Sequence, residues 1–168
     1  MADKYNINNL ELDDNSFYLL PDGDYHFTVD SHEVGFATSD KLPQNTQQIT
    51  CYLEIPYITE DGELDTVVVR NSLNVYKKAL FAIRQFVECI GMVPEKGKVK
   101  IDLDRMDGLT GVCSITSRES SRGNEFNNVQ AFYPPSKTPA VTANDEAWKK
   151  SQAKQEASVM LDVPFLND

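Results

Sequence analysis

Cations and flat aromatic rings are the side chains with the clearest chemical use in this sequence. Arg118 and Arg122 lie in a short polar segment between two apolar stretches. Cations of this kind bind phosphate groups, and exposed aromatic rings stack on nucleic-acid bases. The residues that meet one of these two requirements, and that we expect on loops or outward-facing strand positions, are Lys41, Tyr52, Tyr57, Arg70, Arg118 and Arg122.

The segment that carries the two arginines is predicted to be a β-hairpin. Residues 112–116 and 126–133 are rich in β-branched, small and aromatic residues, and the polar residues between them favour a turn. Pro134 and Pro135 end the second strand, because proline cannot donate a hydrogen bond to a neighbouring strand. The hairpin would therefore present both guanidinium groups at a mobile tip.

Three more strands are predicted upstream, over residues 25–36, 49–58 and 64–73, because apolar residues alternate with polar ones along each. Gly35 is a candidate bulge in the first strand. Asp61 and Gly62 form a favoured turn pair between the second and third strands.

The alternation also predicts which side chains face outward. Cys51 and Leu53 would face the core, which leaves Tyr52 on the outer face. By the same reasoning Arg70 points outward if Val69 points inward.

Residues 75–90 are predicted to form a helix, since apolar residues recur at spacings of three and four. Asn74 is the expected N-terminal cap, and Gly91 occupies the position of a left-handed C-terminal cap. Alternating apolar residues over 96–103 predict a further short extended segment before the hairpin.

The order of elements is β-β-β-α-β-β. This order is that of the OB-fold, a five-stranded Greek-key barrel that binds its ligands on strands two and three and on the flanking loops. We therefore expect an all-β domain with one helix over residues 21–135. A loosely ordered arm would precede it at 1–20, and the polar composition after Pro135 predicts a flexible tail over 136–168 with an apolar tip.

Composition limits the functions that remain. The chain has 168 residues and a formal net charge of -10, which is unusual for a protein that binds phosphates. Half of this imbalance lies in residues 1–24. The three cysteines are far apart and lie in apolar runs, as expected of buried free thiols in a reducing cytoplasm. The start of the sequence is polar and acidic, so we expect no signal peptide, and no apolar run is long enough to span a membrane.

Enzymatic activity is not expected. Phosphate-binding glycine loops, serine-nucleophile motifs and HExxH zinc motifs are absent from the sequence. His26 and His32 have no nearby cysteine partners, so neither a metal nor a cofactor is expected. Acidic pairs such as Asp13 with Asp14 fall in predicted turns, where carboxylates are usually solvated.

Four segments resemble a family of phage-encoded single-stranded DNA-binding proteins from replication and recombination modules. They read LPDGDYHFTV, FVECIGMVP, DLDRMDGLTGVCSIT and GNEFNNVQAFYPP, and the resemblance covers about residues 10–135. It implies an OB core that binds single-stranded DNA with little sequence preference in the cytoplasm of the host cell.

The last residues are similar to the acidic and apolar tip of bacterial single-stranded DNA-binding proteins, which docks on partner enzymes. The residues that match are Leu161, Asp162, Pro164 and Phe165. Phe165 is not terminal here, unlike in that tip. The similarity implies recruitment of replication or recombination proteins, and the chain could also form a homo-oligomer. The alternative is an OB-like adaptor or phage assembly component that binds proteins and no nucleic acid.

Overall fold

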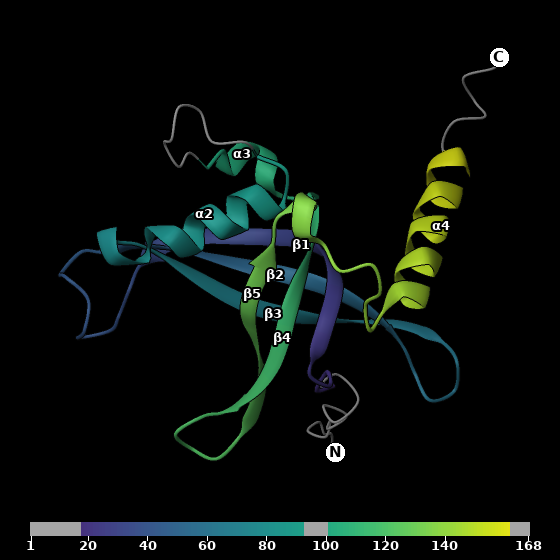
Figure 1. Cartoon of the computed structure of the whole chain (residues 1–168), viewed down its shortest axis with the longest axis horizontal. Coiled ribbons are helices and arrows are strands. Elements are labelled where there is room, and N and C mark those ends of the chain that lie inside the picture. Colours follow the sequence, from purple (N-terminus) through teal and green to yellow (C-terminus); the bar gives the residue numbers. More distant parts are fainter. Residues whose placement is uncertain (1–17, 93–100, 162–168) are drawn as a thin grey trace, which may run out of the picture.

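The computed structural model describes residues 18–92 and 101–161. Its centre is one five-stranded antiparallel sheet in the order β3-β2-β1-β4-β5 (Figure 1). The strands are β1 (Gly23–Phe36), β2 (Gln47–Ile58), β3 (Leu64–Val75), β4 (Thr110–Glu119) and β5 (Glu125–Tyr133). The helices are the short 3₁₀ turns η2 (Lys77–Ala79) and η3 (Pro135–Lys137) and the α-helices α2 (Leu80–Cys89), α3 (Leu103–Met106) and α4 (Asp145–Leu161).

All five predicted strands are confirmed, with the two strands of the arginine-bearing hairpin longer than expected. In its turn the Ser120 N–H donates to Asn124 O, and Gly123 adopts a positive φ of 84°. Such a φ favours glycine, because a Cβ would clash with the backbone there.

The predicted bulge at Gly35 is wrong, because Gly35 pairs regularly with Gln48. The irregularity lies earlier, between Val29 and Ser31, where Asp30 is an extra residue in β1. β1 changes partners near this point: from Gly23 to Thr28 it pairs with β4, and from Thr28 to Phe36 it pairs with β2. A bulge increases the local twist of a strand, which suits such a change.

The core lies on the face of the sheet that the alternation predicted. Cys51, Leu53 and Ile55 of β2 are completely buried, and Val69 and Leu73 of β3 are nearly so. α2 covers this face where β3 and β5 approach one another (Figure 1). Its buried side is formed by Ile83, Phe86, Val87 and Cys89.

The predicted helix begins later than expected. Asn74 belongs to β3, where its Oδ1 accepts a 2.9 Å hydrogen bond from Gln48 Nε2, so it does not cap a helix. The cross-strand pairing outweighs the helical spacing of the residues that follow. The C-terminal cap at Gly91 is confirmed: φ is 90°, and the Gly91 and Met92 N–H groups donate to Glu88 O and Val87 O.

The structure also contains a short helix, α3, that the sequence analysis did not predict. Beside α2, the described residues include α3 and the 17-residue α4. In the predicted extended segment 96–103, residues 96–100 lie outside the described part, and Leu103 begins α3. The mostly-β expectation is confirmed. The sheet is open, because β3 and β5 do not pair with each other in the described residues.

β4 approaches α2 so closely that one position requires glycine. A Cβ added to Gly111 would lie 2.5 Å from Cys89 Sγ and 3.0 Å from Phe27 Cζ. Phe27 in turn packs edge-on against Phe132, which packs edge-on against Phe86 of α2, at centroid distances of 5.7 Å and 5.0 Å. Little room is left for either neighbour to move.

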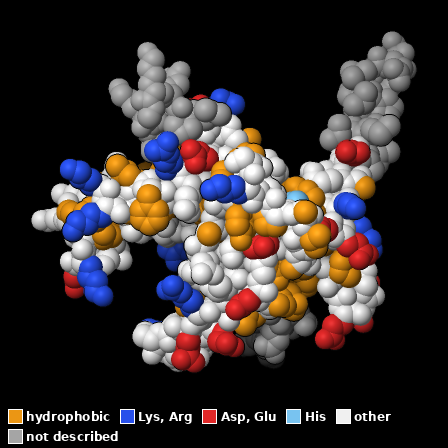
Figure 2. Space-filling model, in the orientation of Figure 1, with side chains coloured by type: hydrophobic (Ala, Val, Ile, Leu, Met, Phe, Trp, Pro, Cys, Tyr) orange, Lys and Arg blue, Asp and Glu red, His pale blue; other side chains and the backbone are white. Residues whose placement is uncertain are grey.

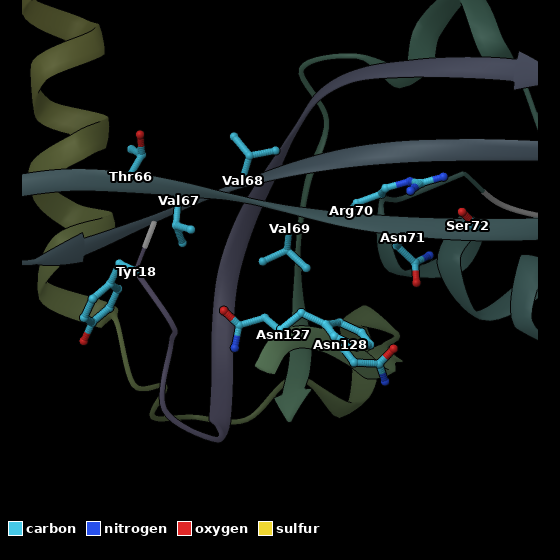
Figure 3. A pocket seen from close by; sticks show the side chains of 11 residues that line it. Tyr18, Thr66, Val67, Val68, Val69, Arg70, Asn71, Ser72, Asn127 and Asn128 are labelled. Atoms are coloured by element: carbon cyan, nitrogen blue, oxygen red, sulfur yellow. The ribbon is translucent and has the colours of Figure 1, made fainter. Parts of the chain in front are cut away.

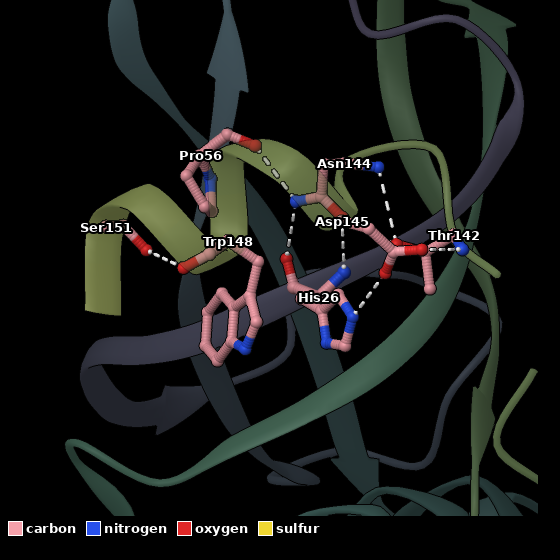
Figure 4. Close-up of polar contacts among 7 residues, drawn as sticks. All are labelled: His26, Pro56, Thr142, Asn144, Asp145, Trp148 and Ser151. Atoms are coloured by element: carbon pink, nitrogen blue, oxygen red, sulfur yellow. Dashed lines mark hydrogen bonds and ion pairs between the residues drawn. The ribbon is translucent and has the colours of Figure 1, made fainter. Parts of the chain in front are cut away.

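The expectation of a flexible tail from residue 136 is wrong for residues 136–156, which form η3, a loop and most of α4. Asn144, 4% exposed, precedes α4 and binds two strands. Its Oδ1 accepts from the His26 N–H at 2.8 Å, and its Nδ2 donates to His26 O and to Pro56 O. One amide thus satisfies backbone groups on β1 and β2 (Figure 4).

Side chains at the start of α4 strengthen this attachment. Asp145 Oδ1 lies 2.9 Å from His26 Nε2, and the Trp148 ring stacks on the His26 ring at 5.0 Å (Figure 4). The Thr142 N–H donates to Asp145 Oδ2, which closes a cap around the first turn of the helix. These contacts, foremost the hydrogen bond from the Thr142 N–H, lower the pKa of Asp145 to about 2. Such long-range contacts leave no periodic signal in the sequence.

Substituting Gly111→Ala should destabilise the fold by about 1–3 kcal/mol, because the added methyl overpacks the contact with Cys89 and Phe27. Denaturant unfolding measures the effect. Gly35→Ala is the matched control, since it adds the same methyl to an open position in β1. Equal stability of the two variants would contradict this account of the packing.

The attachment of α4 should weaken in acid. The pKa of Asp145 is lowered from 3.8 to about 2, so its carboxylate stabilises the docked helix above about pH 4 and loses this effect as the pH falls toward 2. Trp148 is the single tryptophan of the chain, and its fluorescence reports the docking. Asp145→Asn should remove the fluorescence change in this pH window; an unaltered change would refute the assignment.

Candidate nucleic-acid interface

A groove of about 770 Å³ separates the two edge strands of the sheet, β3 and β5 (Figure 3). Residues 66–72 of β3 form one wall and residues 126–128 of β5 the other, with Tyr18 at one end. The groove exists because the two strands flank α2 but do not pair. Its walls therefore expose strand edges whose polar groups can bind a ligand.

The β3 wall carries three valines, at positions 67–69, followed by the polar residues Arg70, Asn71 and Ser72. Arg70 is exposed on the outer face, as predicted, while Val69 is 3% exposed and faces the core. Among the described ion pairs none involves Arg70. Arg70 borders the groove, and its side chain lies on the opposite side of β3 from Asn71 (Figure 3).

Asn71 is the unexpected residue of this wall. It points toward β5, and its Nδ2 is buried with no hydrogen-bond partner among the described residues (Figure 3). A buried donor without an acceptor costs about 1–3 kcal/mol. A ligand that brings an acceptor into the groove would recover this cost. The sequence analysis missed Asn71, because a single asparagine in a strand carries no local signal.

The β5 wall combines an aromatic ring with two amides. Phe126 is 41% exposed and pairs across the hairpin with Arg118. Asn127 is already engaged: its side chain accepts from the Leu20 N–H and donates to Leu20 O, each at 2.9 Å. These two bonds hold the segment before β1 against β5, and they bury Leu20.

Tyr57 does not offer a free ring for stacking. It lies parallel to Tyr18 with ring centroids 4.2 Å apart, and its hydroxyl is 3.4 Å from Asp65 Oδ2. Tyr18 covers one face of Tyr57 and itself reaches the end of the groove. Of these two tyrosines, Tyr18 is therefore the more accessible from the groove. The sequence analysis placed it in the N-terminal arm, residues 1–20.

Tyr52 lies on the outer face of β2, as the alternation predicted, directly beside Arg70 of β3. Its hydroxyl donates a 2.7 Å hydrogen bond to Glu33 Oε1. This bond to a carboxylate raises the pKa of Tyr52, so the phenol stays neutral at physiological pH. Its neighbours, Glu33 of β1 and Arg70 of β3, position the Tyr52 ring on the sheet surface.

The remaining predicted cations lie on the two loops expected to flank the site. Lys41 is exposed in the loop between β1 and β2, Arg118 is exposed near the end of β4, and Arg122 is exposed in the hairpin turn. Glu119 and Glu125 face each other beside the arginines, so the hairpin tip is charge-balanced. Figure 2 shows a recess between the hairpin and the end of the sheet that carries the β1–β2 loop, with Lys and Arg side chains gathered on that end.

The predicted partner-binding tail cannot be placed in this interface. Leu161 is the last residue of α4, and Asp162, Pro164 and Phe165 lie outside the described residues. α4 itself leads away from the sheet, on the side opposite the β1–β2 loop (Figure 1).

The histidines and cysteines have structural partners. His26 binds Asp145, and His32 Nδ1 lies 2.7 Å from Asp107 Oδ1. Within residues 18–92 and 101–156, no three acidic, histidine or cysteine side chains converge as metal ligands. The three cysteines are buried, and burial raises the pKa of Cys51 to about 12 and that of Cys89 to about 11. These thiols stay protonated and unreactive at neutral pH.

Comparison with protein families and with curated proteins finds no match for this chain. No helix in the described part of the chain is both long and apolar enough to cross a membrane. The interface must therefore be interpreted from its own geometry.

Proposed function

We propose that this protein binds single-stranded DNA with little sequence preference along the groove between β3 and β5 and the adjoining face of β2. The resemblance to phage single-stranded DNA-binding proteins supports a role in phage DNA replication or recombination, in the cytoplasm of the host. The proposal rests above all on the unpartnered amide of Asn71 beside the accessible charge of Arg70.

A nucleic-acid strand supplies what this groove lacks. Base carbonyls and phosphate oxygens are acceptors for the Asn71 amide and the Arg70 guanidinium. The exposed ring of Phe126 and the half-buried ring of Tyr52 are flat surfaces on which bases can stack, at about 1–3 kcal/mol per base. Contacts to phosphates and stacking on rings are independent of base identity, which agrees with low sequence preference.

The order of elements supports the same proposal. α2 follows β3 and precedes β4, and it packs between β3 and β5. This arrangement is compatible with an OB-type barrel in which the last closure, between β3 and β5, is open. The OB-fold binds ligands on its second and third strands, where Tyr52 and Arg70 lie side by side.

The negative net charge is compatible with this function because the charge is unevenly distributed. Opposite charges separated by more than about 10 Å are largely screened at 0.1 M salt. The acidic segment 1–24 supplies half of the net charge, so local cations can still attract phosphates. The acidic remainder opposes indiscriminate binding.

Loss of the cations that border the groove or lie on the flanking hairpin should weaken binding of a fluorescent oligo(dT), measured by anisotropy. Arg70→Gln should reduce affinity about tenfold, the value of one charge-assisted hydrogen bond, and the double variant Arg118→Ala with Arg122→Ala should also bind more weakly. Each lost phosphate contact lowers the salt slope by about 0.7. Arg84→Gln is the control, because Arg84 pairs with Glu88 on α2. Wild-type affinity in both groove variants would overturn the proposal.

Asn71 offers a test that separates binding from folding. Asn71→Leu keeps the branched shape of the side chain but removes the unpartnered donor, so the free energy of unfolding should stay equal or rise while oligo(dT) affinity falls. Denaturant unfolding and anisotropy give the two readouts. A loss of stability together with unchanged affinity would show that Asn71 serves the fold instead.

The second candidate function is a protein adaptor that binds no nucleic acid. The unpaired edges of β3 and β5 favour it, because an extended peptide can add to such an edge. Absence of any oligo(dT) binding at low salt and micromolar protein would support the adaptor. In either case we propose that the segment from Leu161 to Phe165 recruits partner proteins, as its similarity to the bacterial tip implies.

A further inference from the structure

The second half of β1 has an edge that no strand covers in the described residues. β4 pairs with β1 only as far as Thr28, and the chain before β4 turns away at Gly108, where φ is 92°. From Ser31 to Phe36, β1 pairs with β2 on one side alone. This edge carries two exposed apolar side chains, Val34 at 52% and Phe36 at 64%.

The direction of the backbone groups along this edge follows from two hydrogen bonds. The Ala37 N–H donates to Thr46 O, in register with the pairing of β1 and β2, so the groups of Ala37 point toward β2. Val29, before the bulge, exchanges bonds with Leu109 and Gly108 on the opposite side. Since direction alternates along a strand, residues 32, 34 and 36 direct their N–H and C=O groups to the open edge.

Open edges of this kind are uncommon, because they promote pairing with another chain. Proteins that must stay monomeric usually protect them with lysine, proline or inward charges. The sequence from residue 31 to 36, SHEVGF, contains no lysine or proline, and its single charge belongs to Glu33, which is on the outer face. The edge is therefore suited to a partner rather than protected from one.

We propose that a second copy of this chain pairs antiparallel with residues 32–36 of β1 about a two-fold axis at Val34, and so joins two sheets into one. Closed two-fold dimers are the commonest oligomers of soluble proteins, and they bring the same surface of both copies together.

One register satisfies both the backbone and the charges. With Val34 opposite Val34 of the second copy, His32 lies opposite Phe36, and all three outward-directed residues form hydrogen-bonded pairs. Glu33 then lies opposite Gly35. A shift of the axis to residue 33 would place the two Glu33 carboxylates opposite each other and would lose a pair of hydrogen bonds.

This register also explains why apolar side chains are exposed at this end of the sheet. Val34 and Phe36 lie on the core face of the sheet. Val34 is in line with the buried Ile49 of β2 and Leu73 of β3. Across the two-fold axis they extend the same apolar face onto the second copy. The proposal does not depend on the proposed function, because the groove lies at β3 and β5, the two far edges of the sheet.

Cross-linking tests the register directly. Cα atoms of a hydrogen-bonded antiparallel pair are about 5.5 Å apart, a distance that a disulfide spans. Full-length Val34→Cys should form a disulfide-linked dimer on mild oxidation with diamide, in the absence of nucleic acid. Val68→Cys is the matched control, since Val68 is a strand residue with nearly the same exposure, 51%. The native cysteines are buried.

Solution mass tests the dimer itself. Light scattering at micromolar protein should give twice the mass of one 18.9 kDa chain for the native protein and for Val68→Lys. Val34→Lys should give the mass of one chain, because two ammonium groups would meet at the axis. A native monomer, a dimer that Val34→Lys leaves intact, or cross-linking of Val34→Cys no faster than that of Val68→Cys would each overturn the proposal. If Val34→Lys does not fold, the cross-linking comparison still decides.

Discussion

Three aromatic rings in edge-to-face contact connect parts of the fold that hydrogen bonds do not join. Phe132 of β5 packs against Phe27 of β1 on one side and against Phe86 of α2 on the other. Each such contact contributes about 0.5–1.5 kcal/mol beyond the burial of the rings. Since β3 and β5 do not pair, this cluster and α2 determine how the two edges of the sheet face each other. The groove depends on them for its shape.

The groove shows how a site can differ chemically from the core beside it. Along β3, Val67 and Val69 complete a close-packed interior, and the next inward residue, Asn71, introduces a donor that the fold does not satisfy. Elsewhere in the described chain, buried polar side-chain groups have hydrogen-bond partners, as Asn144 has on two strands. The Asn71 amide, which borders the groove, has no such partner among the described residues.

α4 illustrates a different constraint. Its sequence is polar and rich in alanine, serine and lysine, a composition typical of disordered segments. It is nevertheless attached, because Asn144, Asp145 and Trp148 meet backbone and ring atoms of His26 more than a hundred residues earlier. Specific contacts at the first turn attach this helix to the sheet.

Short-range patterns in the sequence were sufficient for the strands, the hairpin turn, the C-terminal cap at Gly91 and the facing of Arg70 and Tyr52. These features follow from alternation, from turn chemistry and from the conformational freedom of glycine, which act over a few residues. The start of α2 was misplaced because pairing of Asn74 with Gln48 prolongs β3. The bulge at Asp30 was not predicted for a related reason: it lies where β1 changes partner strands, and this change depends on residues far apart in the sequence.

The sequence by itself determined the mostly-β character of the chain, the order of its elements and the cations and rings available for a ligand. Only the tertiary structure decided which of them share a site. It brought Arg70 and Asn71 opposite Phe126, and it covered Tyr57 with Tyr18. It left one edge of β1 open and held α4 to the sheet. These outcomes depend on contacts between residues that are far apart in the chain, for which neighbouring residue types carry no information.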